Sequence, residues 1–285
     1  MSDVFRLDGE QADGVVVVTV DHPPLQLVDG AFFGALIGLL GRLDADPGVR
    51  AVVWRSADPD FFLMHGDVAA LAQVPGGERP VPEKPNVAAA TLDRLHRSRW
   101  VNIGVVDGAA RGGGAEFLTA LDLRYGTAAA IVGWPEVPMG ILPGSGITAR
   151  LPRMVGRARA LEILLTGRDV HAAELSELGW LQGVVKPEEL LDHAIAVARR
   201  IAAMPPASVV AVKGVVDIAL GDLDAGILAE TRALDALMAA GAHRARMAAF
   251  LQAGGQTRGC EADAERWAAL VSDLVGFREE GANNG

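Results

Sequence analysis

Cysteine is nearly absent from this chain, which carries a single one, Cys260. One thiol can form neither an internal disulfide framework nor a thiolate zinc cluster, and such sparing use fits a cytosolic protein. The six histidines are scattered, and no two have the i, i+4 spacing that would put a pair of metal ligands on one helix face. We therefore expect no metal site and no metal catalysis.

Positive charge is also in short supply. Lysine and arginine number 26 against 36 acidic residues, which gives a formal net charge of −10 and disfavours a nucleic-acid partner. No run approaches the roughly eighteen apolar residues of a membrane span, and residues 1–14 lack the basic and apolar regions of a signal peptide. The expected location is the cytoplasm, with no membrane partner.

Apolar residues are abundant and make up 50% of the 285 positions, so the chain can bury a sizeable core. A helix is predicted over Ala31–Leu43, where apolar residues recur every three or four positions and Asp29 supplies an N-cap. Short β-branched runs bounded by glycine, proline or aspartate predict buried strands over Val15–Val20, Ala51–Trp54, Val101–Val106 and Gly183–Val185. Strands alternating with helices indicate an α/β fold.

Two segments depart from this alternation. Residues 73–85 hold four prolines and two adjacent glycines, which predicts a loop and a candidate flexible lid. Beyond Pro205-Pro206 the pattern is wholly helical, over Val209–Leu220, Leu223–Ala240, Ala242–Gln252 and Glu261–Val275. We therefore divide the chain into a core, residues 1–205, and a helical region, residues 206–285, whose last seven residues have nothing apolar to bury and should be frayed.

A glycine-rich turn is the first candidate functional element. A predicted strand runs into Gly112, Gly113 and Gly114 and then into an apolar segment with a helical pattern, residues 117–121. Backbone N–H groups at such a helix start can hold an oxyanion or a phosphate, although a tight turn or close packing explains the glycines equally well. Neither a P-loop lysine nor the spaced glycines of a dinucleotide site follow.

The second candidate functional element is a pair of glutamates with apolar neighbours. Glu116 follows the glycines, and Glu136 lies twenty positions later between Pro135 and Val137. Burial in apolar surroundings raises the pKa of a carboxyl group towards neutrality, which suits general acid or base catalysis. From local sequence alone, a helix-start residue at 116 and an exposed turn at 136 explain both acids at least as well.

A longer pattern decides between these interpretations. Residues 133–185 hold, in order, Pro-Glu, a Gly-x-x-Pro-Gly turn, a Leu-Pro-Arg-x-x-Gly helix and a Leu-Thr-Gly turn, and they closely resemble the signature of the crotonase (enoyl-CoA hydratase/isomerase) superfamily. Residues 108–126 and 58–71 resemble the family's segments that supply the first glutamate and the two oxyanion-hole amides. The resemblance covers roughly residues 15–216.

The resemblance implies a crotonase-type ββα spiral core with a C-terminal helical oligomerisation region that assembles a homotrimer or a dimer of trimers. It also implies an oxyanion hole formed by the amides of Gly66 and Gly113, with Glu116 and Glu136 as the catalytic pair and Gly144 helping to position water. The expected reaction is hydration of a 2-enoyl-CoA. Coenzyme A then enters as part of the acyl-CoA substrate, and no separate cofactor is expected.

Two residues depart from the family pattern. Met64-His65-Gly66 stands where the family usually has Gly or Ala-Gly before its oxyanion residue. His65 is then an added catalytic group, a polar substrate contact, a structural histidine or a simple lining residue. Trp134 replaces a common glutamine before Pro-Glu and would narrow the acyl pocket. We therefore include Met64, His65 and Trp134 among the candidate substrate-binding residues.

Rival functions remain at this stage. An enoyl-CoA isomerase, a hydrolase or a decarboxylase would use the same oxyanion hole, and a catalytically silent binding or assembly protein would retain only the fold. Ser145 lacks the flanking pattern of a nucleophile elbow, which disfavours a serine hydrolase. A basic group could meet the substrate phosphates, although a solvated helix face explains it better; it comprises Arg94, His96, Arg97 and Arg99.

Overall fold

The protein is described here from a computed structural model that covers residues 4–8, 12–78, 80–204, 206–221, 223–241 and 243–276. The described strands form two sheets. The larger sheet has the order β1 (Phe5–Asp8), β2 (Val15–Val20), β3 (Ala51–Ser56), β5 (Val101–Val106), β7 (Leu123–Gly126) and β10 (Gly183–Val184). The smaller sheet has the order β4 (Phe61–Leu63), β6 (Ala109–Arg111), β8 (Ile131–Gly133) and β9 (Asp169–His171).

Successive turns of the chain add one strand to each sheet. β3 leads into β4, β5 into β6 and β7 into β8, while β3, β5 and β7 are parallel neighbours in one sheet and β4, β6 and β8 in the other. Helices α3 (Val87–His96) and α4 (Gly113–Ala120) carry the chain to the start of the next turn. This repeated path is the ββα spiral of the crotonase fold, as expected.

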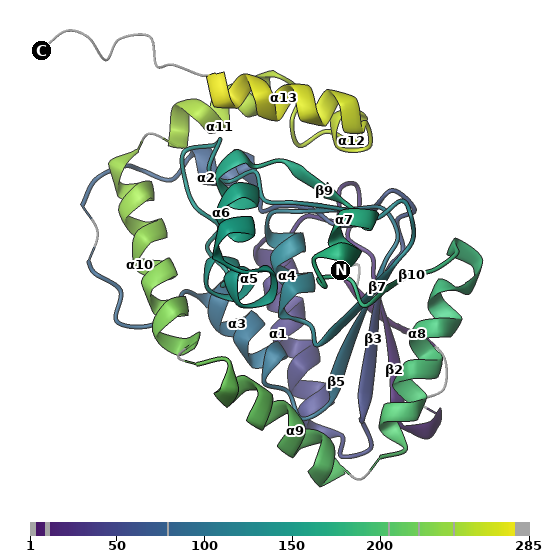
Figure 1. The fold of residues 1–285 in the computed structure, drawn as a ribbon. Coiled ribbons are helices and arrows are strands. Elements are labelled where there is room, and N and C mark those ends of the chain that lie inside the picture. Colours follow the sequence, from purple (N-terminus) through teal and green to yellow (C-terminus); the bar gives the residue numbers. More distant parts are fainter. Residues whose placement is uncertain are drawn as a thin grey trace, which may run out of the picture.

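The two faces of the larger sheet are covered by different helices (Figure 1). Because strand side chains alternate, Val52 and Trp54 face the helix α1 (Gly30–Ala45), whereas Ala51 and Val53 face α8 (Pro187–Ala202). Val16 pairs with Val52 in register, so the apolar rows of neighbouring strands coincide. The core thus lies in two layers, one on each face of the sheet.

Most of the predicted elements are confirmed. β2 and β5 have the predicted bounds, β3 extends two residues further, and α1 begins one residue earlier than expected. The Asp29 side chain accepts a hydrogen bond from the Phe32 amide at 2.8 Å, so it caps α1. The remaining elements of the core are η1 (Ala12–Gly14), α2 (Val68–Ala72), α5 (Ile147–Val155), α6 (Arg157–Thr166) and α7 (Ala172–Glu177).

The described elements after residue 205 are all helical, as predicted. They are α9 (Pro206–Ala219), α10 (Leu223–Ala240), α11 (His243–Gln252), α12 (Arg258–Glu261) and α13 (Ala264–Gly276). The helix expected over residues 261–275 is α13, which begins three residues later, because α12 ends at Glu261 and the Asp263 side chain accepts from the Arg266 amide at the start of α13. Ala242 and the seven terminal residues lie outside the described part.

The last three helices lie across one end of the core (Figure 1). Their buried residues, which include Phe250, Trp267 and Leu270, form one apolar cluster with Val68 of α2 and Met139. The helical region therefore shares a core with the segments around residues 68 and 139. The division of the chain into two domains at residue 205 stays a prediction.

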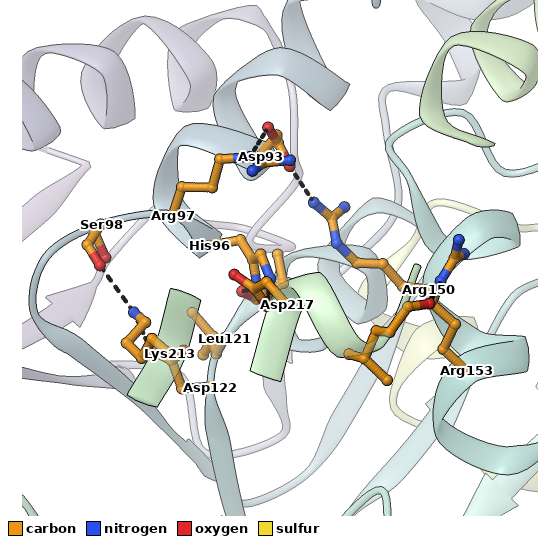
Figure 2. Close-up of polar contacts among 12 residues, drawn as sticks. Asp93, His96, Arg97, Ser98, Leu121, Asp122, Arg150, Arg153, Lys213 and Asp217 are labelled. Atoms are coloured by element: carbon orange, nitrogen blue, oxygen red, sulfur yellow. Dashed lines mark hydrogen bonds and ion pairs between the residues drawn. The ribbon is translucent and has the colours of Figure 1, made fainter. Parts of the chain in front are cut away.

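Polar contacts attach the loop and α9 to the rest of the molecule. The described residues of the loop 73–85 form no helix or strand, and the Gly77 amide donates to the Ala239 carbonyl of α10 at 2.7 Å. On α9, Lys213 donates to Ser98 O at 2.9 Å and to Asp122 at 2.9 Å, and Asp217 lies 3.1 Å from His96 (Figure 2). The outer face of α9 stays exposed.

Candidate functional site

One cavity of about 350 Å³ brings together five of the residues that the sequence singled out. Gly66, Gly113, Glu116, Glu136 and Gly144 all line it. Their positions in the sequence span almost eighty residues, so the spiral, with its successive turns side by side, is what brings them together. Apolar side chains from α1, α2 and α10 complete the wall, among them Phe33, Leu71, Leu234 and Met238.

The glycine turn starts α4 and needs glycine for two reasons. Gly112 has φ +51°, and a Cβ there would lie 2.8 Å from the His65 Cβ and 2.9 Å from Glu136 Oε1. A Cβ on Gly114 would lie 2.1 Å from the Leu63 carbonyl oxygen. The explanation by a tight turn and close packing is therefore confirmed. Gly113 also lines the cavity, and the binding of an oxyanion by its amide stays a prediction.

The amides of Gly66 and Gly113 both line the cavity, and neither has a hydrogen-bond acceptor in the described part of the chain. The Gly112 carbonyl accepts from the Glu116 amide at 2.9 Å, along the axis of α4. Because the peptide is trans, the Gly113 N–H points the opposite way, out of the helix N-terminus. Such donors can stabilise a negative oxygen in the cavity.

Glu116 lies in the first turn of α4 and is only 4% exposed. Its Oε1 accepts a hydrogen bond from the Ser145 amide at 2.9 Å. Burial raises the pKa of Glu116, and this effect outweighs the opposing hydrogen bonds from Ser145 and the Ile147 amide and the positive charge of Arg150. The raised pKa brings proton exchange by Glu116 closer to neutral pH, which suits general acid or base catalysis.

Glu136 reaches the cavity from the segment after β8 and is half-buried. Its backbone carbonyl accepts from the amides of Met139 and Ile141, both at 3.1 Å, so a compact turn fixes the residue. Its Oε1 lies against Gly112, at the start of the glycine turn. The two carboxylates thus approach the same cavity from different elements.

Arg150 supports the Glu116 side of the site from behind. It is 5% exposed, donates to the Ser145 carbonyl at 3.4 Å and forms an ion pair with Asp93 at 3.1 Å (Figure 2). Ser145 is therefore held by its carbonyl while its amide holds Glu116. Asn86 does the same for Gly144, because its side-chain amide donates to the Gly144 carbonyl at 2.8 Å.

The sequence profile of the enoyl-CoA hydratase/isomerase family matches residues 10–254. This chain belongs to that family. A provisionally named enoyl-CoA hydratase from Streptomyces avermitilis is 32% identical, with a TM-score of 0.81 over 96% of this chain and 99% of that one. An enoyl-CoA hydratase/isomerase from Xanthobacter autotrophicus Py2 is 26% identical, with a TM-score of 0.79 over 98% and 100% of the two chains.

Curated relatives in the enoyl-CoA hydratase/isomerase family are much longer. The glyoxysomal fatty acid beta-oxidation multifunctional protein MFP-a of Cucumis sativus is 34% identical over 186 residues, which is 64% of this chain and 25% of that protein. The chain therefore spans about a quarter of the length of the curated relatives it matches.

Three of the predicted substrate-binding residues do not reach the cavity of this family member. Met64 is buried with Leu25 and Phe61 on the other side of β4, and Trp134 is buried in the main core. The His65 ring is 3% exposed overall and is hydrogen-bonded to Glu261 of α12. His65 therefore lies in the surroundings expected of a structural histidine. The expected narrowing of the acyl pocket by Trp134 is not supported, because Trp134 does not line the cavity.

The basic group at residues 94–99 also lies away from the cavity. Arg94 pairs with Asp44, and Arg97 pairs with Asp93 at 2.8 Å. His96 faces Asp217, and Arg99 donates to the Val49 carbonyl at 2.7 Å. These side chains therefore have partners within the protein itself, and a contact with substrate phosphates has no support from the lining of the cavity.

Sequence reasoning missed the contribution of α10. Leu234, Asp235 and Met238 line the cavity, and a Cβ on Gly144 would lie 2.1 Å from the Leu234 Cδ2. The helical pattern of α10 was clear, but no local signal tells which turn of the core it covers. Among the described residues, no three potential metal ligands converge, and none of the helices is long and apolar enough to cross a membrane.

Proposed function

We propose that this family member is an enoyl-CoA hydratase, which adds water across the double bond of a 2-enoyl-CoA thioester. The observation that carries the proposal is the convergence, in one cavity, of two glutamates and of two amides that lack an acceptor among the described residues: Glu116, Glu136, Gly66 and Gly113. Coenzyme A enters as part of the substrate, with no separate cofactor.

The two amides serve the thioester carbonyl. When both N–H groups donate to its oxygen, they polarise the conjugated double bond and stabilise the enolate that forms when Cβ is attacked. A donor of this kind typically contributes about 3–4 kcal/mol to transition-state stabilisation. The direction of the Gly113 N–H, out of the start of α4, supports this role.

The two glutamates serve the water. One carboxylate takes a proton as the water oxygen bonds to Cβ, and the other carboxyl group delivers a proton to Cα as the enolate collapses to the thioester. The water thus supplies the hydroxyl group, and the site recovers its protons when the pair re-equilibrates. The raised pKa of Glu116 brings its proton transfer closer to neutral pH. Gly144, which lines the same cavity, is proposed to help position the water.

Two rivals are weaker on this geometry. An isomerase moves one proton between carbon atoms and can use a single acid/base, whereas here two carboxylates share the cavity. A silent binding protein was considered on the expectation that His65 and Trp134 obstruct the pocket, but neither side chain lines it. Hydrolysis and decarboxylation would use the same amides and remain outcomes of the test.

Assembly into a homotrimer or a dimer of trimers is part of the proposal. The outer face of α9 exposes several valines to solvent in the single chain, among them Val212 at 63% and Val215 at 64%. Contiguous apolar surface of this kind on a helix commonly marks an interface between subunits.

A panel of acyl-CoA esters tests the function. The purified protein is mixed with 2-enoyl, 3-enoyl and saturated acyl-CoA esters of several chain lengths, and both binding and product identity are measured. A hydratase converts 2-enoyl-CoA to a 3-hydroxyacyl-CoA. An isomerised, hydrolysed or decarboxylated product would identify the protein as the corresponding enzyme. Binding without turnover would indicate a catalytically silent binding protein.

A further inference from the structure

His65 is a buried imidazole with an acceptor at each nitrogen. Its Nδ1 lies 2.9 Å from the Gly66 carbonyl oxygen and its Nε2 lies 2.7 Å from Glu261 Oε1. A carbonyl and a carboxylate both accept, so the ring donates from both nitrogens as an imidazolium. Burial lowers the pKa of His65, but the charge of Glu261 and the two hydrogen bonds outweigh it and raise the pKa.

These contacts fix the residue that carries one of the cavity amides. Gly66 has a peptide plane on each side, and glycine resists rotation of these planes less than any other residue. The preceding plane is held because the His65 carbonyl accepts from the Val28 amide at 3.1 Å. The following plane is held because the Gly66 carbonyl accepts from His65 Nδ1. In a trans peptide the N–H opposes the C=O of the preceding residue, so the bond from Val28 sets the direction of the Gly66 N–H. The bond from His65 fixes the plane on the other side of Gly66, so the glycine cannot rotate away from that direction.

Glu261 is itself held firmly in place. It is 1% exposed, and its Oε1 accepts from the Gln256 amide at 2.9 Å as well as from His65. Arg111 donates to the Glu261 backbone carbonyl at 3.0 Å, pairs with Asp169 at 2.7 Å, and lies 3.9 Å above the Trp267 ring. These hydrogen bonds hold the Glu261 carboxylate in position beside His65.

The same C-terminal segment also holds the residues that follow Gly66. Gln256 has φ +58°, a conformation that non-glycine residues rarely adopt. Its side chain accepts from the Val68 amide at 2.7 Å and donates to Asp67 at 2.9 Å, so it binds the N-terminus of α2. Segment 256–261 therefore forms several hydrogen bonds with residues 65–68, although the two segments are almost 200 residues apart in sequence.

We propose that the buried His65–Glu261 pair is a positioning device that aims the Gly66 amide at the acyl carbonyl, which makes segment 256–261 of the helical region part of the catalytic apparatus. This inference rests on the proposed function of the cavity. Neither side chain lines the cavity, so both act through Gly66. A displacement of about 1 Å in such a donor can lower the rate 100-fold.

Two isosteric substitutions separate positioning from packing. His65→Asn keeps an amide N–H near the position of Nδ1, towards Gly66, and leaves Glu261 without its histidine. His65→Gln keeps an N–H near the position of Nε2, towards Glu261, and removes the donor to Gly66. The inference predicts opposite orders for the two variants: Asn lowers the melting temperature more, whereas Gln lowers kcat more, by about 10- to 100-fold, with KM little changed.

If the variant with the lower melting temperature also had the lower kcat, the inference would be overturned, and His65 would be a packing residue. A crystal structure of ligand-free His65→Gln provides a second readout, independent of turnover: the inference expects the Gly66 peptide to rotate or to occupy two orientations. If the parent protein turns over no acyl-CoA, the proposed function fails, and this structure still decides the inference. An unmoved Gly66 N–H in His65→Gln would refute it.

Discussion

Replacing Glu116 with glutamine should separate activity from stability. The glutamine side chain keeps the shape of the glutamate, since its oxygen can accept from the Ser145 amide and its nitrogen can donate to the Ser145 hydroxyl. It cannot exchange a proton. Removing a positioned acid or base typically lowers the rate by about 10²- to 10⁴-fold, so hydration should fall within that range while acyl-CoA binding is retained.

The stability of Glu116→Gln relative to the parent protein should rise with pH. Folding raises the pKa of Glu116 above its ordinary value of 4.5, chiefly through burial, so the ionised form is less favourable in the folded chain than in the unfolded one. The penalty is absent at a pH well below 4.5 and grows as the pH rises through the raised pKa. Glutamine never ionises. The melting temperature of Glu116→Gln relative to the parent should therefore increase from acid to neutral pH.

The assay pairs a rate with a melting curve. Initial rates of enoyl-CoA consumption are measured at saturating substrate, and melting temperatures of both proteins are measured at several pH values. At neutral pH the variant should melt no more than about 2 °C below the parent, which corresponds to about 1 kcal/mol or less. A folded Glu116→Gln protein with the parent rate would refute the proton-transfer role. A loss of rate that only follows a large loss of stability would return Glu116 to a structural role.

Other changes have equally definite expectations. Gly113→Pro removes the Gly113 N–H and should slow turnover about 10²- to 10³-fold, whereas Gly113→Ala retains the N–H and should be far more active; circular dichroism checks that both are folded. Gly114→Ala should prevent folding, because its Cβ would lie 2.1 Å from a backbone oxygen, while Gly34→Ala on α1 has open space and should be neutral or stabilising. Sedimentation should give about 90 kDa or more for chains of 29.7 kDa, Val215→Asp should reduce this mass, and a single species of monomer mass for the parent would contradict the proposed assembly.

The strands β2, β3 and β5 of the larger sheet were predictable because each has six residues, enough to show a pattern, whereas β1 and β7, with four residues each, were not predicted. The β-branched runs at residues 15–20 and 101–106 have their expected bounds. The strands β4, β6, β8 and β9 have three residues each, too few for a periodicity to appear, so the second sheet was predictable only through the family resemblance. The end of α12 was missed although Asp263, a common N-cap residue, marks the start of the next helix.

The candidate site also has parts that were predictable from the sequence and parts that were not. The glycine turn and the two glutamates are marked by motifs within a short stretch of sequence, and all of them line the cavity. The surroundings of His65 depend on Glu261, 196 positions away, and no local pattern reports a contact of that range. The covering of Gly144 by Leu234 is equally non-local. Sequence thus identified the groups with candidate chemistry, and tertiary packing determines what holds them.

The central claim is that water is added to the double bond of an enoyl thioester in this cavity. Turnover of crotonyl-CoA in water enriched in heavy oxygen tests it most directly, with the position of the label read by mass spectrometry. The account predicts label in the C3 hydroxyl group of a 3-hydroxyacyl-CoA and none in the thioester carbonyl. Label in a released carboxylate would instead indicate hydrolysis, and an absence of label in any product, with each 2-enoyl-CoA tested, would contradict the hydratase assignment.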